Sequence, residues 1–173
     1  MANVKLPKSL DPVKSAQKRA SYNGVYLKGD LQRLCEAVTE VTSDAQVKVE
    51  FAKDAQGLTY FQGQAEISVV LTCQRSNRAF AHEVTTAFCF SPVQGMGDAE
   101  FLPEKYEPIE VDTQGAVDLF QLIEDELILS LPVVPFHPDE DNTVVVNEIQ
   151  FGESVESAER PNPFAVLKEL KRD

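Results

Sequence analysis

Three successive runs of alternating apolar and polar residues constrain the fold of this chain more than any other feature. The runs are residues 47–52, 58–73 and 77–93. The turn DAQG at residues 54–57 joins the first two, and a tight turn from Cys73 to Arg78 joins the second and third. Runs rich in β-branched and aromatic residues, joined by short turns, predict an antiparallel β meander. Gly63, inside the second run, is expected to mark a bulge.

The longest helical pattern covers residues 118–131. Asp118 is expected to cap an amphipathic helix there, with a leucine-rich stripe on one face. Glu124, Asp125 and Glu126 could in principle form an acid–base pair, but a charge run on such a helix is interpreted as its solvated face. The chain is therefore predicted to be α+β: an antiparallel sheet of five or six strands, covered by one long amphipathic helix and flanked by short terminal helices.

Two shorter helices are expected before the strands. Asp11 and Pro12 are typical of the cap and first residue of a helix, which here is short and basic. Asp30 is expected to cap a second helix, in which Cys35 lies on the apolar stripe as a small core residue. Residues 21–27 between them read as a turn followed by a short extended piece.

The net charge of −12 over 173 residues is unevenly distributed. Residues 1–33 carry seven Lys or Arg against two acidic residues, whereas residues 34–160 carry 24 acidic residues against six basic ones. We expect one domain with a basic N-terminal arm at 1–33, an acidic α+β body at 34–160 and a C-terminal helix at 161–173. Such asymmetry indicates contact with nucleic acid or an acidic surface, or an arm that docks on its own body.

Nothing in the sequence predicts a membrane or secretory protein. There is no apolar run of transmembrane length, and the N-terminal stretch MANVKLPKSLDPVK has no apolar core of a signal peptide. The expected location is the cytoplasm. Three cysteines, Cys35, Cys73 and Cys89, are then expected to be free thiols.

The stretch LTCQRSNRAF contains half of a Cys-x-x-Cys pair. Cys73 is the first member, and Ser76 occupies the position of the second sulfur. A tetrahedral zinc site needs four Cys or His ligands, and no spacing requires His82 and His137 to converge on this turn. The pair is therefore interpreted as degenerate, and we expect no metal.

No catalytic signature stands out. The sequence has no G-x-S-x-G, no phosphate-binding glycine motif and no H-E-x-x-H. We therefore expect no enzyme, no cofactor and no small-molecule substrate. One alternative stays open: a divalent-metal-dependent hydrolase or nuclease that uses the acidic loop Asp139, Glu140 and Asp141 beside His137.

A binding function is the main alternative to catalysis. The basic groups that could contact phosphates or a partner are Lys14, Lys18, Arg19, Arg75 and Arg78. No RNP-type aromatic cluster or G-x-x-G clamp accompanies them, so the sequence offers charge without a base-readout motif. A strongly acidic body repels phosphates except through its basic arm. This favours a protein partner, or a protein–RNA particle, over naked RNA.

Four stretches stand out together: KLPKSLDPVKSAQKR, LTCQRS, YEPIEV with VDLFQLIEDELILSLPVVPFH, and PNPFAVLKELK. In this order the set resembles the YceD family, the large ribosomal RNA subunit accumulation proteins of bacteria and plastids. The resemblance covers essentially the whole chain. It implies a role in the synthesis, processing or stability of 23S ribosomal RNA, with no catalytic activity. The implied partner is large-subunit RNA or its precursor particle, reached directly or through a basic protein.

The resemblance also bears on the degenerate pair. Many family members look like C-x-R-C in the middle, with a further cysteine shortly after the P-x-H segment. Here Cys73 and Arg75 match that pattern, Ser76 replaces the second cysteine, and HPDEDN after His137 supplies none. The turn is therefore interpreted as a remnant that holds its shape without metal.

Overall fold

The computed structural model describes residues 5–95 and 102–137 of the chain. These residues belong to a compact unit, residues 1–138, and a second unit is formed by residues 139–173. The C-terminal helix expected at 161–173 and the acidic loop Asp139–Asp141 lie outside the described residues. No helix in the described part is both long and apolar enough to cross a membrane.

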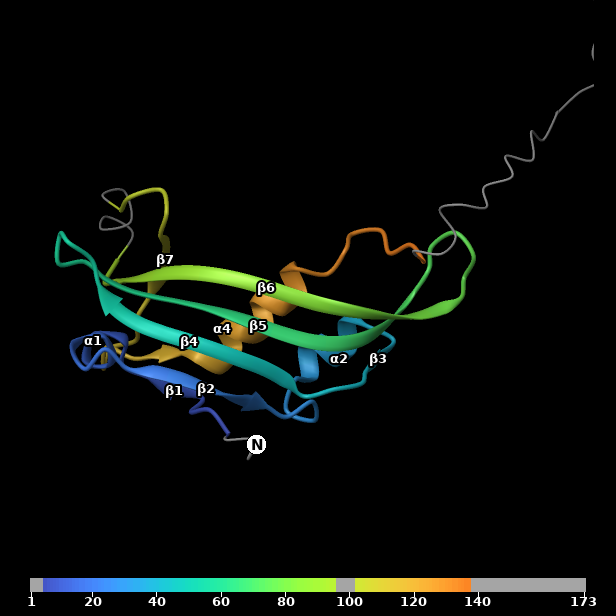
Figure 1. Ribbon diagram of the computed structural model, residues 1–173, viewed down its shortest axis with the longest axis horizontal. Helices are drawn as coiled ribbons and strands as arrows, with labels where there is room; N and C mark the ends of the chain where they lie inside the picture. Colours follow the sequence, from blue (N-terminus) through green and yellow to red (C-terminus); the bar gives the residue numbers. More distant parts are fainter. Residues whose placement is uncertain (1–4, 96–101, 138–173) are drawn as a thin grey trace, which may run out of the picture. The chain divides into compact units, whose positions relative to one another are not determined.

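A six-stranded sheet forms the centre of the described unit (Figure 1). Its strands are β2 (Ser21–Tyr26), β3 (Glu40–Val41), β4 (Ala45–Lys53), β5 (Thr59–Thr72), β6 (Ala79–Val93) and β7 (Glu107–Glu110). The order is β2-β4-β5-β6-β7, and β3 pairs with β5 beyond the end of β4. β4, β5 and β6 pair antiparallel, as the alternation predicts. β7 instead runs parallel to β6, because a long connection rather than a tight turn joins them.

Strand β2 occupies Ser21–Tyr26, where a turn followed by a short extended piece was expected, so the extended part is confirmed and the turn is wrong. Asn23-Gly24 has the composition of a turn, but Gly24 lies opposite Val47 in a continuous antiparallel pairing with β4. Tyr26, at the end of the strand, is fully buried, and its hydroxyl donates to the Pro7 carbonyl at 2.8 Å. Part of the basic N-terminal segment therefore belongs to the sheet. A separate two-stranded sheet joins β1 (Ser9–Leu10) to β8 (Val117–Asp118).

The described helices are α1 (Pro12–Gln17), α2 (Gln32–Ala37) and α4 (Leu119–Leu129). Asp11 caps α1 by accepting the Lys14 N–H at 3.0 Å, and Asp118 caps α4 by accepting the Gln121 N–H at 2.9 Å. Both caps agree with the sequence prediction. The helix expected over 118–131 forms as α4 but is shorter than expected, with 11 residues and an end at Leu129.

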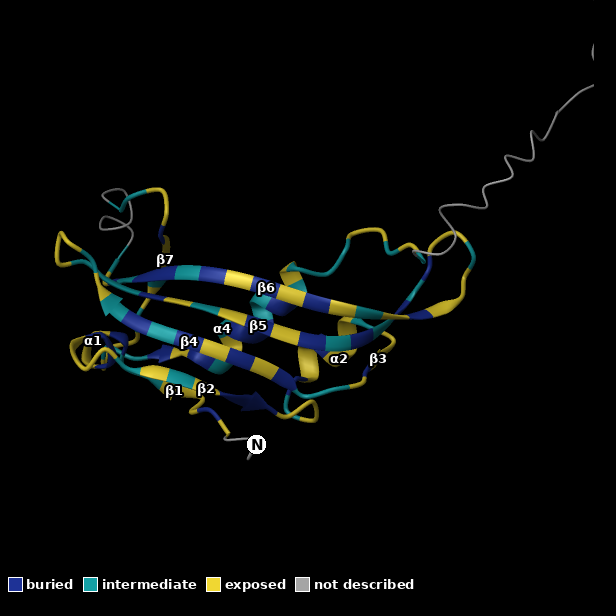
Figure 2. Ribbon diagram, in the orientation of Figure 1, coloured by how far each residue is buried: buried dark blue, intermediate teal, exposed yellow. Residues whose placement is uncertain are grey.

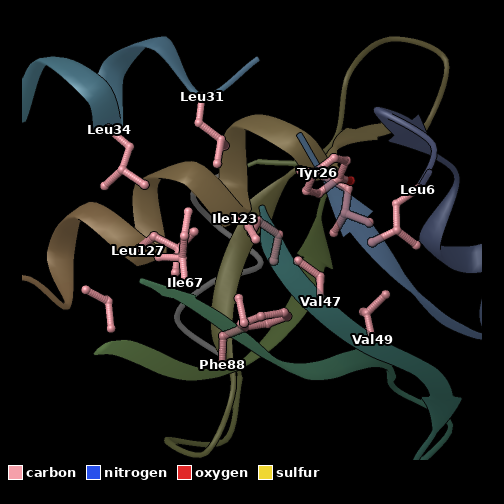
Figure 3. Packing of buried hydrophobic residues seen from close by; sticks show 14 of the residues in the cluster. Leu6, Tyr26, Leu31, Leu34, Val47, Val49, Ile67, Phe88, Ile123 and Leu127 are labelled. Carbon is pink, nitrogen blue, oxygen red and sulfur yellow. The ribbon is translucent and has the colours of Figure 1, made fainter. Parts of the chain in front are cut away.

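Helices α2 and α4 cover one face of the sheet, and the hydrophobic core lies between these helices and the sheet. Buried and exposed residues alternate along β4, β5 and β6, so one face of each strand is buried and the other is exposed to solvent (Figure 2). The helices pack against the buried face of the sheet through Leu31 and Leu34 from the α2 region and Ile123 and Leu127 from α4 (Figure 3). Each such leucine contributes about 2 kcal/mol by burial.

The interpretation of Glu124, Asp125 and Glu126 as a solvated face is wrong for Glu124. Glu124 is only 3% exposed, and its Oε1 accepts the main-chain N–H groups of Arg33 at 2.9 Å and Leu34 at 3.2 Å. Asp125 forms an ion pair with the Arg33 side chain. These carboxylates therefore hold the beginning of α2 against α4.

The prediction that Asp30 caps α2 is also wrong. The cap position is Leu31, which has no side-chain hydrogen bond, while Asp30 pairs with Lys5 at 2.9 Å. Glu124 supplies the missing acceptor from another helix. Cys35, expected in the core, is exposed instead. The helix is turned so that Leu31 and Leu34 alone face the sheet.

Gly63 marks a close approach between strands, and the expected bulge is absent. The pairing register continues through it, with Val49 opposite on one side and Phe88 on the other. A Cβ atom at this position would meet the Lys48 carbonyl oxygen and would lie 2.6 Å from the Phe88 ring carbon Cζ. Glycine is required here because the Phe88 ring occupies the space of a side chain.

Candidate functional site

The turn between β5 and β6, residues Cys73–Arg78, is held by its own main chain. The Cys73 N–H donates to the Arg78 carbonyl at 2.8 Å, and the Asn77 N–H donates to the Cys73 carbonyl at 2.9 Å. Asn77 has a φ of 56°, a left-handed conformation that asparagine adopts more readily than most residues. The sequence therefore builds a tight turn that needs no further ligand to close it.

The segment that follows α4 lies on this turn. The Gln74 N–H donates to the Pro135 carbonyl at 2.9 Å, and the His137 N–H donates to the Cys73 sulfur at 3.4 Å. The His137 ring packs against Phe80, with ring centroids 5.5 Å apart. The structure thus brings together Cys73 and the P-x-H segment, which are 64 residues apart in the sequence.

The Cys73 thiol is buried in a shell of donors that favour its ionised form. Its pKa is lowered to about 7, chiefly by the Ser76 hydroxyl, then by the Ser76 N–H, and further by the N–H groups of His137 and Arg75, against a desolvation cost. The Ser76 hydroxyl oxygen is itself buried and makes no hydrogen bond of standard geometry with the described residues. We interpret its position beside the sulfur as a close electrostatic contact.

These residues do not fit a tetrahedral zinc centre. Zinc takes thiolate and imidazole ligands, and Ser76 offers only a hydroxyl where a second thiolate would stand. The described residues contain no group of three or more His, Cys, Asp or Glu side chains placed to hold a metal ion. Main-chain hydrogen bonds hold this turn together, and we derive no chemistry through a metal.

The five basic candidates lie at two opposite ends of β5. Lys14, Lys18 and Arg19 are exposed on and just after α1, which lies beside the end of β4 through the hydrogen bond from the Phe51 N–H to the Ala20 carbonyl at 2.9 Å. Lys14 is partly neutralised by Asp11 at 2.9 Å. We call these three residues the α1 basic site.

Arg75 and Arg78 are exposed on the turn at the far end of β5, and we call this pair the turn basic site. β5 has 14 residues, so the two sites are separated by about 40 Å. The structure therefore does not join the predicted basic residues into one patch. A single ligand could contact both sites only if it were as long as the sheet.

Comparisons with known proteins match the chain to one family and to one relative over nearly its whole length. A family model described as "Large ribosomal RNA subunit accumulation protein YceD" matches residues 61–171. A protein of Haemophilus influenzae with the same description is 46% identical over 173 residues, which cover 99% of both chains. The chain belongs to the YceD family. No solved structure matches it.

The resemblance noted from the sequence leads us to expect a cysteine at position 76, where this chain has a serine. The Ser76 hydroxyl and N–H lower the pKa of the Cys73 thiol. The His137 N–H of the P-x-H segment donates to the Cys73 sulfur. The turn and this segment therefore contact each other without a second thiol.

Sequence reasoning missed two groups of acidic residues at the surface of the sheet. Glu66 and Glu83 are diagonal neighbours on β5 and β6 at the uncovered face, where hydrogen bonding with the Glu83 carboxyl, and then its charge, raises the pKa of Glu66. On the helix side, Glu126 receives a 3.4 Å hydrogen bond from the Thr86 hydroxyl. Burial, and then the charge of Glu107, raises the pKa of Glu126. Charge counting detected an acidic body but could not locate these groups, because they join residues from different strands, or from a strand and helix α4.

Proposed function

We propose that this chain is a non-enzymatic accessory factor that supports accumulation of the 23S RNA of the large ribosomal subunit by binding a precursor particle in the cytoplasm. The observation that carries the proposal is the near full-length match to a relative described by that role. The basic sites provide groups suited to RNA phosphates. The acidic remainder of the unit suits a basic protein of the particle.

The arrangement of charges favours a particle over naked RNA as the partner. The two basic sites lie about 40 Å apart along the sheet, with carboxylates between them on β5 and β6. A phosphate backbone that crossed this surface would meet Glu66 and Glu83. A partner that presents RNA at the ends and basic protein in the middle would satisfy both kinds of charge.

The metal-dependent hydrolase alternative is not carried further. The family description names no catalytic activity. Its candidate residues Asp139, Glu140 and Asp141 lie outside the described part of the chain.

Sedimentation tests the proposed function. A tagged copy of the full chain is expressed in a strain that lacks the native gene, and lysate is run on a sucrose gradient at low and moderate salt, with and without ribonuclease. We expect the chain to travel with large-subunit precursors and to move to the top of the gradient after ribonuclease. A chain that stays at the top under every condition, in cells whose 23S RNA level does not depend on the gene, would contradict the proposal.

A further inference from the structure

Strand β6 has a long edge without a neighbouring strand. On one side, β5 pairs with it from Ala79 to Phe90. On the other side, β7 pairs only with the end of the strand, from Phe90 to Val93. Figure 1 shows β6 at the margin of the sheet, with β7 at one end and the turn to β5 at the other. Among the described residues, no strand pairs with this second side between residues 79 and 89.

Two hydrogen bonds show which main-chain groups face this free edge. The Arg78 carbonyl accepts from Cys73 and so points toward β5, whereas the Val93 carbonyl accepts from Val111 on the opposite side. Main-chain groups alternate in direction along a strand, so the odd-numbered residues of β6 face away from β5. The residues whose N–H and C=O groups face the free edge are Ala79, Ala81, Glu83, Thr85 and Ala87. All five are exposed.

Carboxylates lie beside this edge on both faces of the sheet. Glu83 and Glu66 lie on the uncovered face. Glu126 of α4 reaches Thr86 on the helix side, and Glu107 lies close enough to raise the pKa of Glu126. Within residues 5–95 and 102–137, no Lys or Arg forms an ion pair with any of these four carboxylates. The edge therefore combines unpaired strand hydrogen-bonding groups with uncompensated negative charge.

We propose that the free edge of β6 binds an extended, lysine- or arginine-rich protein segment, which adds to the sheet as a further strand beside residues 79–89. An added strand gains affinity from main-chain hydrogen bonds and specificity from side chains on alternate faces. Cations on one face of the segment meet Glu83, and those on the other face meet Glu126. The inference rests on the proposed function in that the segment belongs to a basic protein of the particle.

The edge is suited to a strand and unsuited to RNA. The side chains of Ala79, Ala81 and Ala87 are small and leave the main chain accessible from the uncovered face. Exposed edges in most proteins are blocked by lysine, proline or a bulge, and this one carries only Glu83 as a charged residue pointing outward. RNA phosphates would be repelled by the carboxylates on both faces.

Binding of a synthetic peptide tests the proposal. The probe is a fluorescent nine-residue peptide of sequence KKTTKKTTK, which places lysines on both faces of an extended strand, titrated with the full chain and followed by anisotropy. The control peptide has glutamate in place of each lysine. Backbone hydrogen exchange is measured with and without the lysine peptide. We expect binding of the lysine peptide alone, and slower exchange of the amides of Ala81, Glu83, Thr85 and Ala87 in the complex.

Two matched pairs of variants separate main-chain pairing from charge. Thr85→Pro removes an N–H at the free edge without removing one that pairs with β5, and Thr85→Ala keeps that N–H. Glu83→Gln removes a carboxylate at the edge, and Glu36→Gln removes an exposed one on α2. We expect Thr85→Pro to weaken peptide binding by about tenfold. We expect Glu83→Gln to weaken it by about fivefold. Circular dichroism establishes that each variant is folded.

The alternative outcomes overturn the proposal. Equal binding of the two peptides, equal loss with Glu36→Gln and Glu83→Gln, or unchanged exchange along β6 would each show that the edge is not a strand acceptor. Preferential binding of an RNA oligonucleotide at this edge would also overturn it. The proposed function fails separately: a chain that binds the lysine peptide at β6 but never sediments with precursor particles would show that the edge accepts a basic strand and that its partner is not a protein of the particle.

Discussion

The Glu124 carboxylate of α4 accepts the main-chain N–H of Leu34 in α2 at 3.2 Å, although 90 residues separate the two in the sequence. The same oxygen accepts the Arg33 N–H at 2.9 Å. The first N–H groups of a helix have no partner within the helix, and Leu31 at the cap position has no polar side chain to offer. Glu124 therefore completes α2 and fixes it to α4 over the same face of the sheet.

Replacement of Glu124 with alanine is expected to lower the free energy of unfolding by about 2–4 kcal/mol, because two N–H groups lose a charged acceptor in a site closed to water. Urea unfolding followed by far-ultraviolet circular dichroism measures the change. Asp125→Asn is the control. It removes only the partly exposed ion pair with Arg33, so it should cost about 1 kcal/mol or less. Equal costs for the two variants would show that Glu124 does not cap α2.

Strands β4, β5 and β6 were predictable because each has one buried and one solvent-exposed face, so apolar and polar residues alternate in its sequence. Runs 47–52, 58–73 and 77–93 became β4, β5 and β6 for this reason. β2 was not predictable, because Asn23-Gly24 has turn composition and only the opposite residue Val47 shows that it is extended. The role of Glu124 depends on N–H groups from a distant helix, which helical periodicity cannot reveal.

The candidate site was predictable only in part. The Cys73 turn was visible because Ser76 follows at the spacing of a second cysteine. The separation of the two basic sites was not visible, since it depends on the length of β5 and on where the N-terminal segment lies. The free edge of β6 could not be predicted from the sequence either, because an edge is defined by the absence of a neighbouring strand, and strand order is not visible in the sequence.

Gly63→Ala is expected to lower the free energy of unfolding by about 3 kcal/mol, because the new Cβ would overlap the Lys48 carbonyl and the Phe88 ring. Thermal unfolding measures the effect. Gly29→Ala is the matched control, since nothing lies within 4 Å of a Cβ there. It should change stability by about 1 kcal/mol or less. A Gly63→Ala chain as stable as the control would show that β5 and β6 can separate at this point at little cost.

The Cys73 thiol should titrate with a pKa of about 7 in the folded chain. The test follows thiolate ultraviolet absorbance in a Cys35→Ala, Cys89→Ala chain. Adding Ser76→Ala should raise the pKa toward the ordinary thiol value, because the hydroxyl is the largest stabilising group. The reciprocal chain that keeps Cys89 alone should titrate above the ordinary value, since burial raises the pKa of that thiol.

The same shift makes stability depend on pH. The folded pKa of Cys73 lies below its unfolded value, so the ionised thiol stabilises the fold fully above the unfolded pKa, and this contribution is lost as pH falls through about 7. Urea midpoints should therefore rise from neutral to alkaline pH more steeply in the parent than in Cys73→Ala. Identical slopes would show that the thiol ionises equally in both states.

The two basic sites should contribute independently to particle binding, because sites about 40 Å apart have additive effects. Charge reversal at Lys18 and Arg19, or at Arg75 and Arg78, should each shift the salt concentration at which the chain leaves large-subunit precursors on a sucrose gradient. The combined variant should shift it by the sum. Lys28→Glu combined with Lys53→Glu reverses two exposed lysines outside both defined sites, and it is the control with the same change in net charge as each two-residue variant. If the turn variant alone abolished association while the α1 variant had no effect, the particle would contact only the Cys73 end of the sheet. The basic N-terminal residues would then interact with the acidic body of their own chain and not with the particle.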